Sequence, residues 1–346
     1  MTSFASEIWE QPQALRDTLD GIGGEIDALA PLAEKLRQGH IQRVMLTGMG
    51  SSYYALVPSV IYLMRNGVTA LAIESSELLY YYPETLDART LLVAVSQSGA
   101  SVEVRRLVEE LKREATLVGV TNMPDSPLER ASDVRVHMRA GREETVSSKS
   151  YVCSLAALHL LARGLVGDDL TDSRTGLRRI ADAVEDWLPD WSARADAMVN
   201  WFSGCRFIEF LGRGASCASA MTGALISKEC AKFPTEGLGG GQFRHGPMEL
   251  TSPELGVILF AGAAATRPLS YGLACDLADS GARVALVGGD ADAAPGVLHI
   301  PLPDADEWIA PIAEIIPVQL FAAAFARSRG VEVGKFNFGS KVTTIE

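Results

Sequence analysis

Two serine-rich turns each follow a short hydrophobic, β-branched segment in the first third of the chain. G-M-G-S-S at 48–52 follows the segment 43–47, and S-Q-S-G-A-S at 96–101 ends the segment 91–96. A strand that enters a helix through small residues offers unpaired backbone N–H groups and the positive end of the helix dipole. Several hydroxyls beside such N–H groups are typical of a site that holds phosphate with neutral donors.

A nucleotide is a less suitable ligand for these turns than a simple phosphate group. The P-loop ending G-K-[ST] is missing, and the dinucleotide fingerprint G-x-G-x-x-G has Tyr53 at its third glycine. A similar turn at 212–216 has Cys217 at that position. For this second turn, a plain tight connection between strand and helix remains an equally good interpretation.

Three residues could move protons or react with a carbonyl group. Glu229 lies in a helical pattern, where a single glutamate is commonly just solvated. His245 lies in the glycine-flanked loop 239–247, and imidazole titrates near neutral pH, as proton transfer requires. Lys341 is five residues from the end of the chain. Ends of chains are often frayed, but its β-branched neighbours suggest that this tail docks, which would make its amine available for an imine.

These residues need a parallel sheet to position them. Strand-like segments alternate with helical patterns such as 53–64 and 102–114, after a helical stretch at 13–38, and this rhythm is typical of doubly wound folds. We predict an α/β protein with two tandem domains, each a doubly wound parallel sheet flanked by helices, spanning 1–190 and 191–346. The predicted strands are 43–47, 70–74, 91–96, 116–121 and 133–138 in the first domain, and 206–211, 256–261 and 283–288 in the second.

The two predicted domains begin alike. The segments 44–52 and 207–216 each read as a strand, G-x-G, serine and a helix, and Gly48 is separated from Gly212 by as many residues as Ser52 from Ser216. We interpret this as the duplication of one α/β unit. Helical patterns at 168–201 would link the copies, and the helices of the second copy are predicted near 218–228, 269–279 and 309–327.

Composition excludes several classes of partner. The 346 residues suffice for two domains, and a net charge of −12 without a Lys/Arg-rich run disfavours nucleic acid and anionic membranes. Five cysteines without a C-x-x-C pair are typical of a reduced, intracellular protein. No export signal or apolar run of about 18 residues is present. We expect a cytoplasmic protein without a metal site, because no His, Asp or Glu residues have ligand spacing.

The motifs taken together resemble the sugar isomerase (SIS) family, and within it the isomerase half of the glutamine–fructose-6-phosphate aminotransferases. The resemblance runs from Glu7 to Glu346 and so covers nearly the whole chain. It rests on G-S-S at 50–52, S-Q-S-G at 96–99, S-S-K-S-Y at 147–151, F-R-H-G-P at 243–247, I-A-P at 309–311 and S-K-V-T at 340–343.

The resemblance implies a role for each candidate residue. Glu229 would move a proton between carbons 1 and 2 of an open-chain sugar, and His245 would assist ring opening from the neighbouring subunit of a homodimer. Lys341 would hold the sugar as an imine, and no cofactor is implied. The 6-phosphate would be held by Ser52, Ser96, Gln97, Ser98 and Ser101, with Ser51 beside it and Ser147 near the sugar hydroxyls.

The sequence also departs from the pattern of the aminotransferases. A lysine three residues before the glutamate is Ile226 here, the glutamate after S-Q-S-G is Ala100, and the Pro-Arg of the tail is Phe336-Asn337. We also expect the chain to lack the glutaminase domain that precedes the isomerase half, so that it would not draw ammonia from glutamine.

The resemblance therefore implies an isomerase/deaminase that converts an amino-sugar 6-phosphate of the glucosamine 6-phosphate type into the ketose phosphate and ammonia. Three alternatives remain: a deglycase of phosphorylated fructosyl-amines, ammonia-dependent synthesis of a hexosamine phosphate, and a non-catalytic sugar-phosphate sensor. A sensor would require only the phosphate site, whereas Glu229, His245 and Lys341 together favour catalysis.

Overall fold

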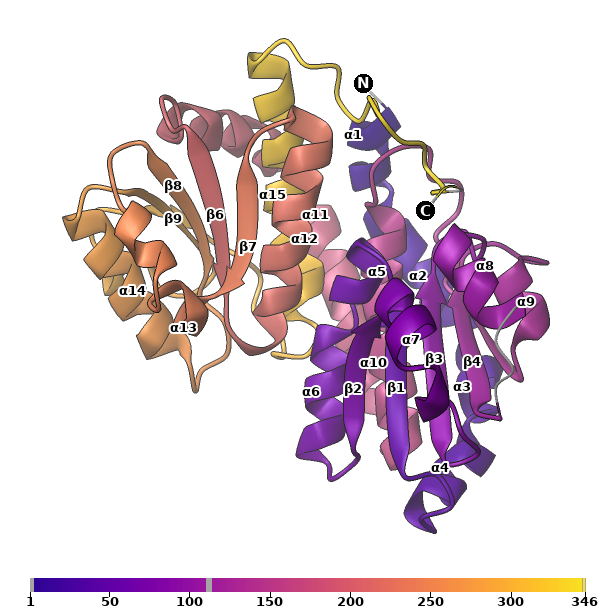
Figure 1. The fold of residues 1–346 in the computed structure, drawn as a ribbon. Helices are drawn as coiled ribbons and strands as arrows, with labels where there is room; N and C mark the ends of the chain where they lie inside the picture. The colour runs from indigo at the N-terminus through magenta and orange to yellow at the C-terminus, as the bar shows by residue number, and fades with distance from the viewer. Residues whose placement is uncertain (1–2, 110–113, 344, 346) are drawn as a thin grey trace. The chain divides into compact units, whose positions relative to one another are not determined.

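The computed structural model describes residues 3–109, 114–343 and 345, and each of its two compact units contains one sheet (Figure 1). We call them the N-unit, made of Gln11–Glu143, Lys149–Ala181 and Asn337–Glu346, and the C-unit, made of Met1–Glu10, Glu144–Ser148 and Asp182–Phe336. Both units are discontinuous in sequence. The predicted boundary after residue 190 falls within a continuous helix, and the domain limits stay a prediction.

The sheet of the N-unit is parallel throughout, with the strand order β2-β1-β3-β4-β5. Every residue of β3 is buried, as its uninterrupted run of apolar residues predicts for a strand covered on both faces. On one face, Leu92 and Leu117 pack with Leu107 of a covering helix. The strands are β1 Arg43–Gly48, β2 Ala70–Glu74, β3 Thr90–Ser96, β4 Thr116–Thr121 and β5 Val134–His137.

One helix predicted for the N-unit is divided in the structure. The predicted helix 53–64 is two helices, α5 and α6, with Pro58 in the first turn of α6. Of the predicted helix 102–114, residues 110–113 lie outside the described part of the chain. The helices are α2 Gln11–Gly21, α3 Gly23–Asp27, α4 Ala30–Arg37, α5 Ser51–Tyr54, α6 Val57–Arg65, α7 Ser75–Tyr81, α8 Val102–Glu109, α9 Pro127–Ala131 and α10 Lys149–Val166, with the 3-10 turn η1 Pro83–Thr85.

The C-unit contains a second parallel sheet, with the order β10-β9-β8-β6-β7, so the first strand of each sheet occupies the same position. The strands are β6 Phe207–Gly212, β7 Thr235–Gly239, β8 Leu255–Phe260, β9 Arg283–Val287 and β10 Leu298–Ile300. The helices are α1 Ser3–Trp9, α12 Cys217–Ala231, α13 Gly240–Phe243, α14 Arg267–Asp279 and α15 Ala310–Ser328, with η2 Gly214–Ser216, η3 Pro247–Leu250 and η4 Ala291–Ala293. The long α11, Thr171–Trp201, is divided between the units.

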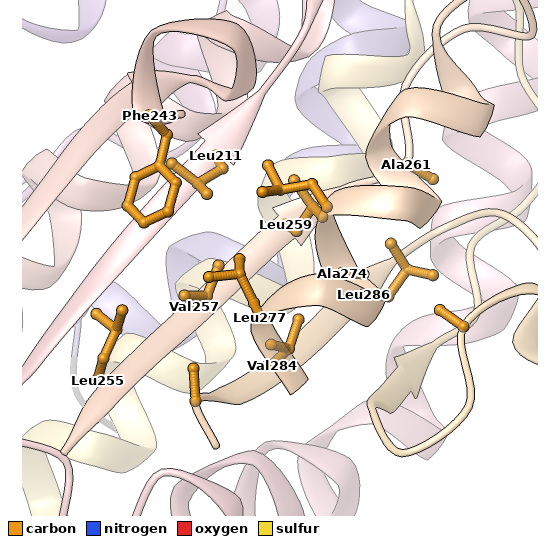
Figure 2. Close-up of a cluster of buried hydrophobic side chains, with 13 residues drawn as sticks. Leu211, Phe243, Leu255, Val257, Leu259, Ala261, Ala274, Leu277, Val284 and Leu286 are labelled. Carbon is orange, nitrogen blue, oxygen red and sulfur yellow. The ribbon is translucent and has the colours of Figure 1, made fainter. Parts of the chain in front are cut away.

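One face of this second sheet carries a closely packed apolar core (Figure 2). Leu259 of β8, Leu286 of β9 and Leu277 of α14 belong to this cluster, and Phe243 of α13 lies beside Leu211 of β6. Within the described chain, α15 alone is long and apolar enough to cross a membrane, and 89% of that stretch is buried inside the protein. Its apolarity is thus accounted for by the core.

Candidate functional site

The S-Q-S-G turn folds tightly at the carboxyl end of β3. Ser96 Oγ accepts a hydrogen bond from the N–H of Gly99 at 3.1 Å, and Ser98 Oγ accepts one from the N–H of Ala100 at 3.2 Å. Gly99 has a φ of 60°, and a Cβ there would lie 2.2 Å from Ser126 Oγ. Because each serine oxygen accepts from the backbone, its own O–H group can donate to a ligand.

The second serine turn lies at the end of the neighbouring strand. Gly48 ends β1 so close to β3 that a Cβ would lie 3.0 Å from the carbonyl oxygen of Val95. Gly50, with a φ of 52°, then turns the chain into α5, which places Ser51 in a buried and Ser52 in a half-buried position. β1 and β3 are adjacent at the point where the strand order reverses, which is where open α/β sheets bind ligands.

A cavity of about 1000 Å³ adjoins the S-Q-S-G turn, and part of the C-terminal tail lines it. Gln97 and Ser98 contribute from the turn after β3, and Lys341 and Val342 contribute from the tail. The structure therefore brings together two predicted phosphate-binding residues and the predicted imine-forming lysine. The remaining lining residues are Ala100, Asn122, Met123, Pro124, Ser126, Pro127, His137, Arg139, Gly141, Arg142 and Glu143.

The tail is docked rather than frayed, which confirms the prediction from its β-branched residues. The N–H of Val102, the first residue of α8, donates to the carbonyl oxygen of Thr343 at 3.0 Å. Lys341 Nζ forms an ion pair with Glu143, whose side chain is 0% exposed. These two contacts, from residues on either side of Val342, hold the lysine at the edge of the cavity.

Carboxylates lie beside two basic residues that line the cavity. Arg139 Nη2 forms an ion pair with Glu25 at 2.5 Å, and His137 Nε2 lies 2.7 Å from a carboxylate oxygen of Glu129. Arg139 has a φ of 52°, and its guanidinium also donates to the carbonyl oxygen of His137 at 2.9 Å. With Arg139 engaged in this way, the hydroxyl and backbone donors of the serine turns are the groups best suited to hold an anion.

The C-unit carries the other three predicted site residues. Glu229 is half-buried near the end of α12, and Lys232 Nζ donates to its carbonyl oxygen at 2.6 Å. His245 is exposed in the turn after α13, where its N–H donates to the carbonyl oxygen of Gln242 at 2.9 Å. Ser147 is half-buried in the segment before α10.

Glu229 and His245 are separated by the length of β7. Thr235, at the start of β7, donates from Oγ1 to the carbonyl oxygen of Ala224 at 2.7 Å, and a Cβ on Gly237 would lie 2.6 Å from Cα of Met221. α12 therefore runs antiparallel to β7. Glu229 lies toward the beginning of this strand, whereas α13 follows its arrowhead (Figure 1). At 1.5 Å per helical residue of α12, the beginning of β7 is about 15–20 Å from its end, where α13 starts.

The second glycine turn, at 212–216, has a structural explanation. Ser216 Oγ donates to Glu314 at 2.7 Å, and Ser219 Oγ donates to the same carboxyl group at 2.6 Å. Burial raises the pKa of Glu314, although these two hydrogen bonds oppose the rise. Ser216, which stands where the first turn has Ser52, thus serves an internal contact, and this favours the tight-connection interpretation of the second turn.

Glu143 was not among the sequence candidates, although it lies at the cavity and contacts Lys341. Its only signal in the sequence is a pair of acidic residues, Glu143 and Glu144, before the S-S-K-S-Y motif. Such a pair is ordinary on a protein surface, and the contact spans about two hundred residues of sequence.

Comparison with known proteins agrees with this geometry. Residues 36–163 match the family model described as SIS domain, and this part of the chain is a SIS domain. The chain is 31% identical to the isomerizing glutamine–fructose-6-phosphate aminotransferase of Pyrococcus horikoshii, over 98% of this chain and 57% of that relative. It thus spans little more than half the length of the curated relative.

Two solved structures show the same two-SIS-domain fold. The C-terminal domain of glucosamine-fructose-6-phosphate aminotransferase from Francisella tularensis has a TM-score of 0.88 at 23% identity, covering 96% of this chain and 98% of that one. Glucosamine-6-phosphate deaminase from Thermotoga maritima has a TM-score of 0.75 at 20% identity, covering 99% and 100%. The chain therefore resembles the isomerase half of the aminotransferases, as its motifs predicted.

Proposed function

We propose that this protein is a phosphosugar isomerase/deaminase that converts an amino-sugar 6-phosphate of the glucosamine 6-phosphate type into the ketose 6-phosphate and ammonia. One observation carries the proposal most directly: Lys341 from the tail lines the same cavity as Gln97 and Ser98. A phosphate anchor beside an amine that can form an imine suits the open-chain form of a sugar phosphate. The names of the relatives and of the solved structures point to the same class of substrate.

In the proposed reaction, the serine turns hold the phosphate and so fix the distance to the reacting carbons. The phosphate is held by the residues inferred from the sequence, Ser52, Ser96, Gln97, Ser98 and Ser101. Ser51 lies adjacent to them, and Ser147 contacts the sugar hydroxyls. Lys341 holds the open-chain sugar as an imine at carbon 2, where its amine displaces the amino group as ammonia, and one water then hydrolyses this imine to the ketose and the free lysine. Glu229 removes the proton from one of two adjacent carbons and returns it to the other, which is general base and then general acid catalysis.

The proposed active site is shared between two copies of the chain. His245 would open the sugar ring, but it lies at the opposite end of β7 from Glu229, too far for both to contact one sugar. A homodimer in which His245 comes from the second copy removes this conflict. We further propose that the two units arose by duplication, since their strand orders match, and that the enzyme is cytoplasmic.

The proposal is tested by incubating the protein with glucosamine 6-phosphate and measuring ammonia and ketose phosphate in one coupled assay. We expect both products in equal amounts, and a decrease in kcat of about 100-fold or more in Glu229→Gln, the range for loss of a general base. Glu332→Gln, which changes an exposed glutamate of the same unit, is the matched control. If wild type releases no ammonia from any hexosamine 6-phosphate, the deaminase assignment is wrong.

A deglycase is the second candidate, because apolar residues could accommodate the substituent of a fructosyl-amine. Ile226 stands where the family pattern has lysine, and, within the N-unit, Met123 and Pro124 line the cavity of about 1000 Å³. Turnover of a 6-phosphofructosyl-amine without turnover of hexosamine phosphates would favour it. Formation of glucosamine 6-phosphate from fructose 6-phosphate and ammonium would favour synthesis, and binding without turnover would favour a sensor.

A further inference from the structure

Glu143 is held in one orientation from two sides. The N–H of Ser150 donates to Glu143 Oε1 at 2.9 Å, and Ser150 Oγ donates to Oε2 at 2.6 Å. Ser150 is the second residue of α10, so the carboxylate also lies at the positive end of a helix of 18 residues. From the opposite side, Lys341 Nζ donates to Oε2.

The carboxylate remains charged although it is inaccessible to solvent. Burial by itself raises the pKa of Glu143, but the nearby ammonium of Lys341 and the hydrogen bonds from Lys341 and Ser150 outweigh burial and hold the pKa below its usual value. Truncating one partner of a buried ion pair leaves a charge that neither water nor protein compensates. The pair therefore restrains the tail lysine more strongly than an exposed ion pair would.

Several other basic groups lie near this pair, and Lys341 is the lysine among the residues that line the cavity. Lys149, the first residue of α10, is buried and donates from Nζ to the carbonyl oxygen of Arg142 at 2.7 Å. Arg139, which also lines the cavity, forms an ion pair with Glu25, and His137 Nε2 lies 2.7 Å from a carboxylate oxygen of Glu129. Arg142 is exposed and lines the cavity as well.

We propose that Glu143 is the positioning residue of Lys341: it holds the lysine at the cavity and accepts a proton from it when the sugar imine forms. This inference rests on the proposed function, because it assumes that Lys341 reacts with a sugar carbonyl. An amine must lose a proton before its nitrogen lone pair can attack carbon. A fixed carboxylate in contact with Nζ can take this proton without exposing the site to water.

The step balances. The ammonium of Lys341 transfers one proton to Glu143, and the neutral nitrogen forms a bond to the carbonyl carbon of the open-chain sugar. The carbonyl oxygen takes up a proton from Glu143 and a second one from the nitrogen and leaves as water. The product is the iminium ion, so one ammonium and one carbonyl give one iminium and one water.

The experiment traps the imine. Wild type is incubated with fructose 6-phosphate and sodium borohydride between pH 6 and pH 10, and the reduced adduct on the Lys341 peptide is quantified by mass spectrometry. Glu143→Gln is expected to reduce the trapping rate about 100-fold at pH 7, with the deficit becoming smaller as the pH rises, because hydroxide can then take the proton in place of the carboxylate. Glu143→Asp should recover part of the rate at pH 7. Glu144→Gln, which changes the exposed neighbour, is the matched control.

Binding of glucitol 6-phosphate, which has no carbonyl group, is measured by calorimetry in parallel. It should change less than threefold in Glu143→Gln, because the phosphate anchor is intact. If wild type neither binds this probe nor forms an adduct, the proposed function fails. If wild type does both and Glu143→Gln forms the adduct as fast at pH 7, only the role of Glu143 is wrong.

Ser150→Ala keeps the proposal testable should Glu143→Gln fail to fold. It removes one hydrogen bond to the charged carboxylate without touching the cavity lining, and it should slow trapping at pH 7 about tenfold or more, the value of one such bond. An unchanged trapping rate across the pH range in Ser150→Ala would overturn the inference in that case.

Discussion

Glu209 is a buried carboxyl group that the proposed chemistry does not use. It lies in β6 between Glu236 of β7 and Val257 of β8, its side chain is 0% exposed, and neither oxygen has a hydrogen-bond partner. Burial, together with the charge of Glu236, raises the pKa of Glu209 to about 7, although the charge of Lys228 opposes the rise. We therefore predict that Glu209 makes the stability of the C-unit depend on pH.

The sign and size of this pH-dependent change in stability follow from the linkage between proton binding and folding. The folded pKa of about 7 exceeds the reference value of 4.5, so protonation favours the folded state. The contribution is fully present below about pH 4.5 and is lost as pH rises through about 7. The resulting loss of stability is about 1 kcal/mol at pH 5 and about 3 kcal/mol at pH 8. Replacing Glu209 by leucine should remove this difference of about 2–3 kcal/mol.

Hydrogen exchange measured on peptides of β6 and β8 reports the free energy of opening for this unit alone. The difference in opening free energy between Glu209→Leu and wild type should grow by about 2–3 kcal/mol from pH 5 to pH 8. Glu249→Gln, an exposed acid of the same unit, should show no such trend. Parallel pH profiles for wild type and Glu209→Leu would refute the reasoning, since they would mean that water or a partner compensates the charge.

Two further predictions concern packing and accessibility. Gly99→Ala places alanine at a φ of 60° and brings its Cβ against Ser126 Oγ. Because this backbone conformation costs alanine about 1–2 kcal/mol, binding of glucitol 6-phosphate, measured by calorimetry, should weaken about tenfold or more. Gly24→Ala, with open space around its Cβ, should bind like wild type, and equal affinities of all three proteins would contradict the assigned role of the turn. Burial raises the pKa of Cys153 to about 12 and also raises that of Cys230, so a thiol reagent at pH 8 should label half-buried Cys275 first. Labelling of Cys153 at a comparable rate before denaturant is added would be inconsistent with the packing of α10.

The parallel sheets were predictable because their buried strands are continuous apolar runs. β3 and β8 could be identified for that reason, and so could the turns that follow β1 and β3. β7 could not, because its glycines resemble a loop. Gly237 is required there by the close approach of α12, where a Cβ would lie 2.6 Å from Cα of Met221. A contact between two elements, rather than local propensity, dictates the residue.

The candidate site was predictable only as far as its local motifs reach. The S-Q-S-G turn combines a glycine at positive φ with serines that cap the turn, and such local chemistry leaves a clear sequence signal. Glu143 and Glu209 leave no such signal in the sequence. The first depends on a tail nearly two hundred residues away, and the second alternates with apolar residues in a strand, where a glutamate usually faces water.

The separation of Glu229 and His245 along β7 leads to a final prediction about shared active sites. If each site takes Glu229 from one copy and His245 from the other, Glu229→Gln and His245→Ala are each inactive as homodimers. A mixed dimer of the two variants then contains one site with both native residues and one with neither. Random assembly makes half of the dimers mixed, and each mixed dimer has one intact site of two. Co-expression should therefore restore about one quarter of the wild-type ammonia release. Purified variants that are mixed without subunit exchange should remain inactive. Absence of any recovery in isolated mixed dimers would place both residues in one copy, in conflict with the antiparallel course of α12 and β7.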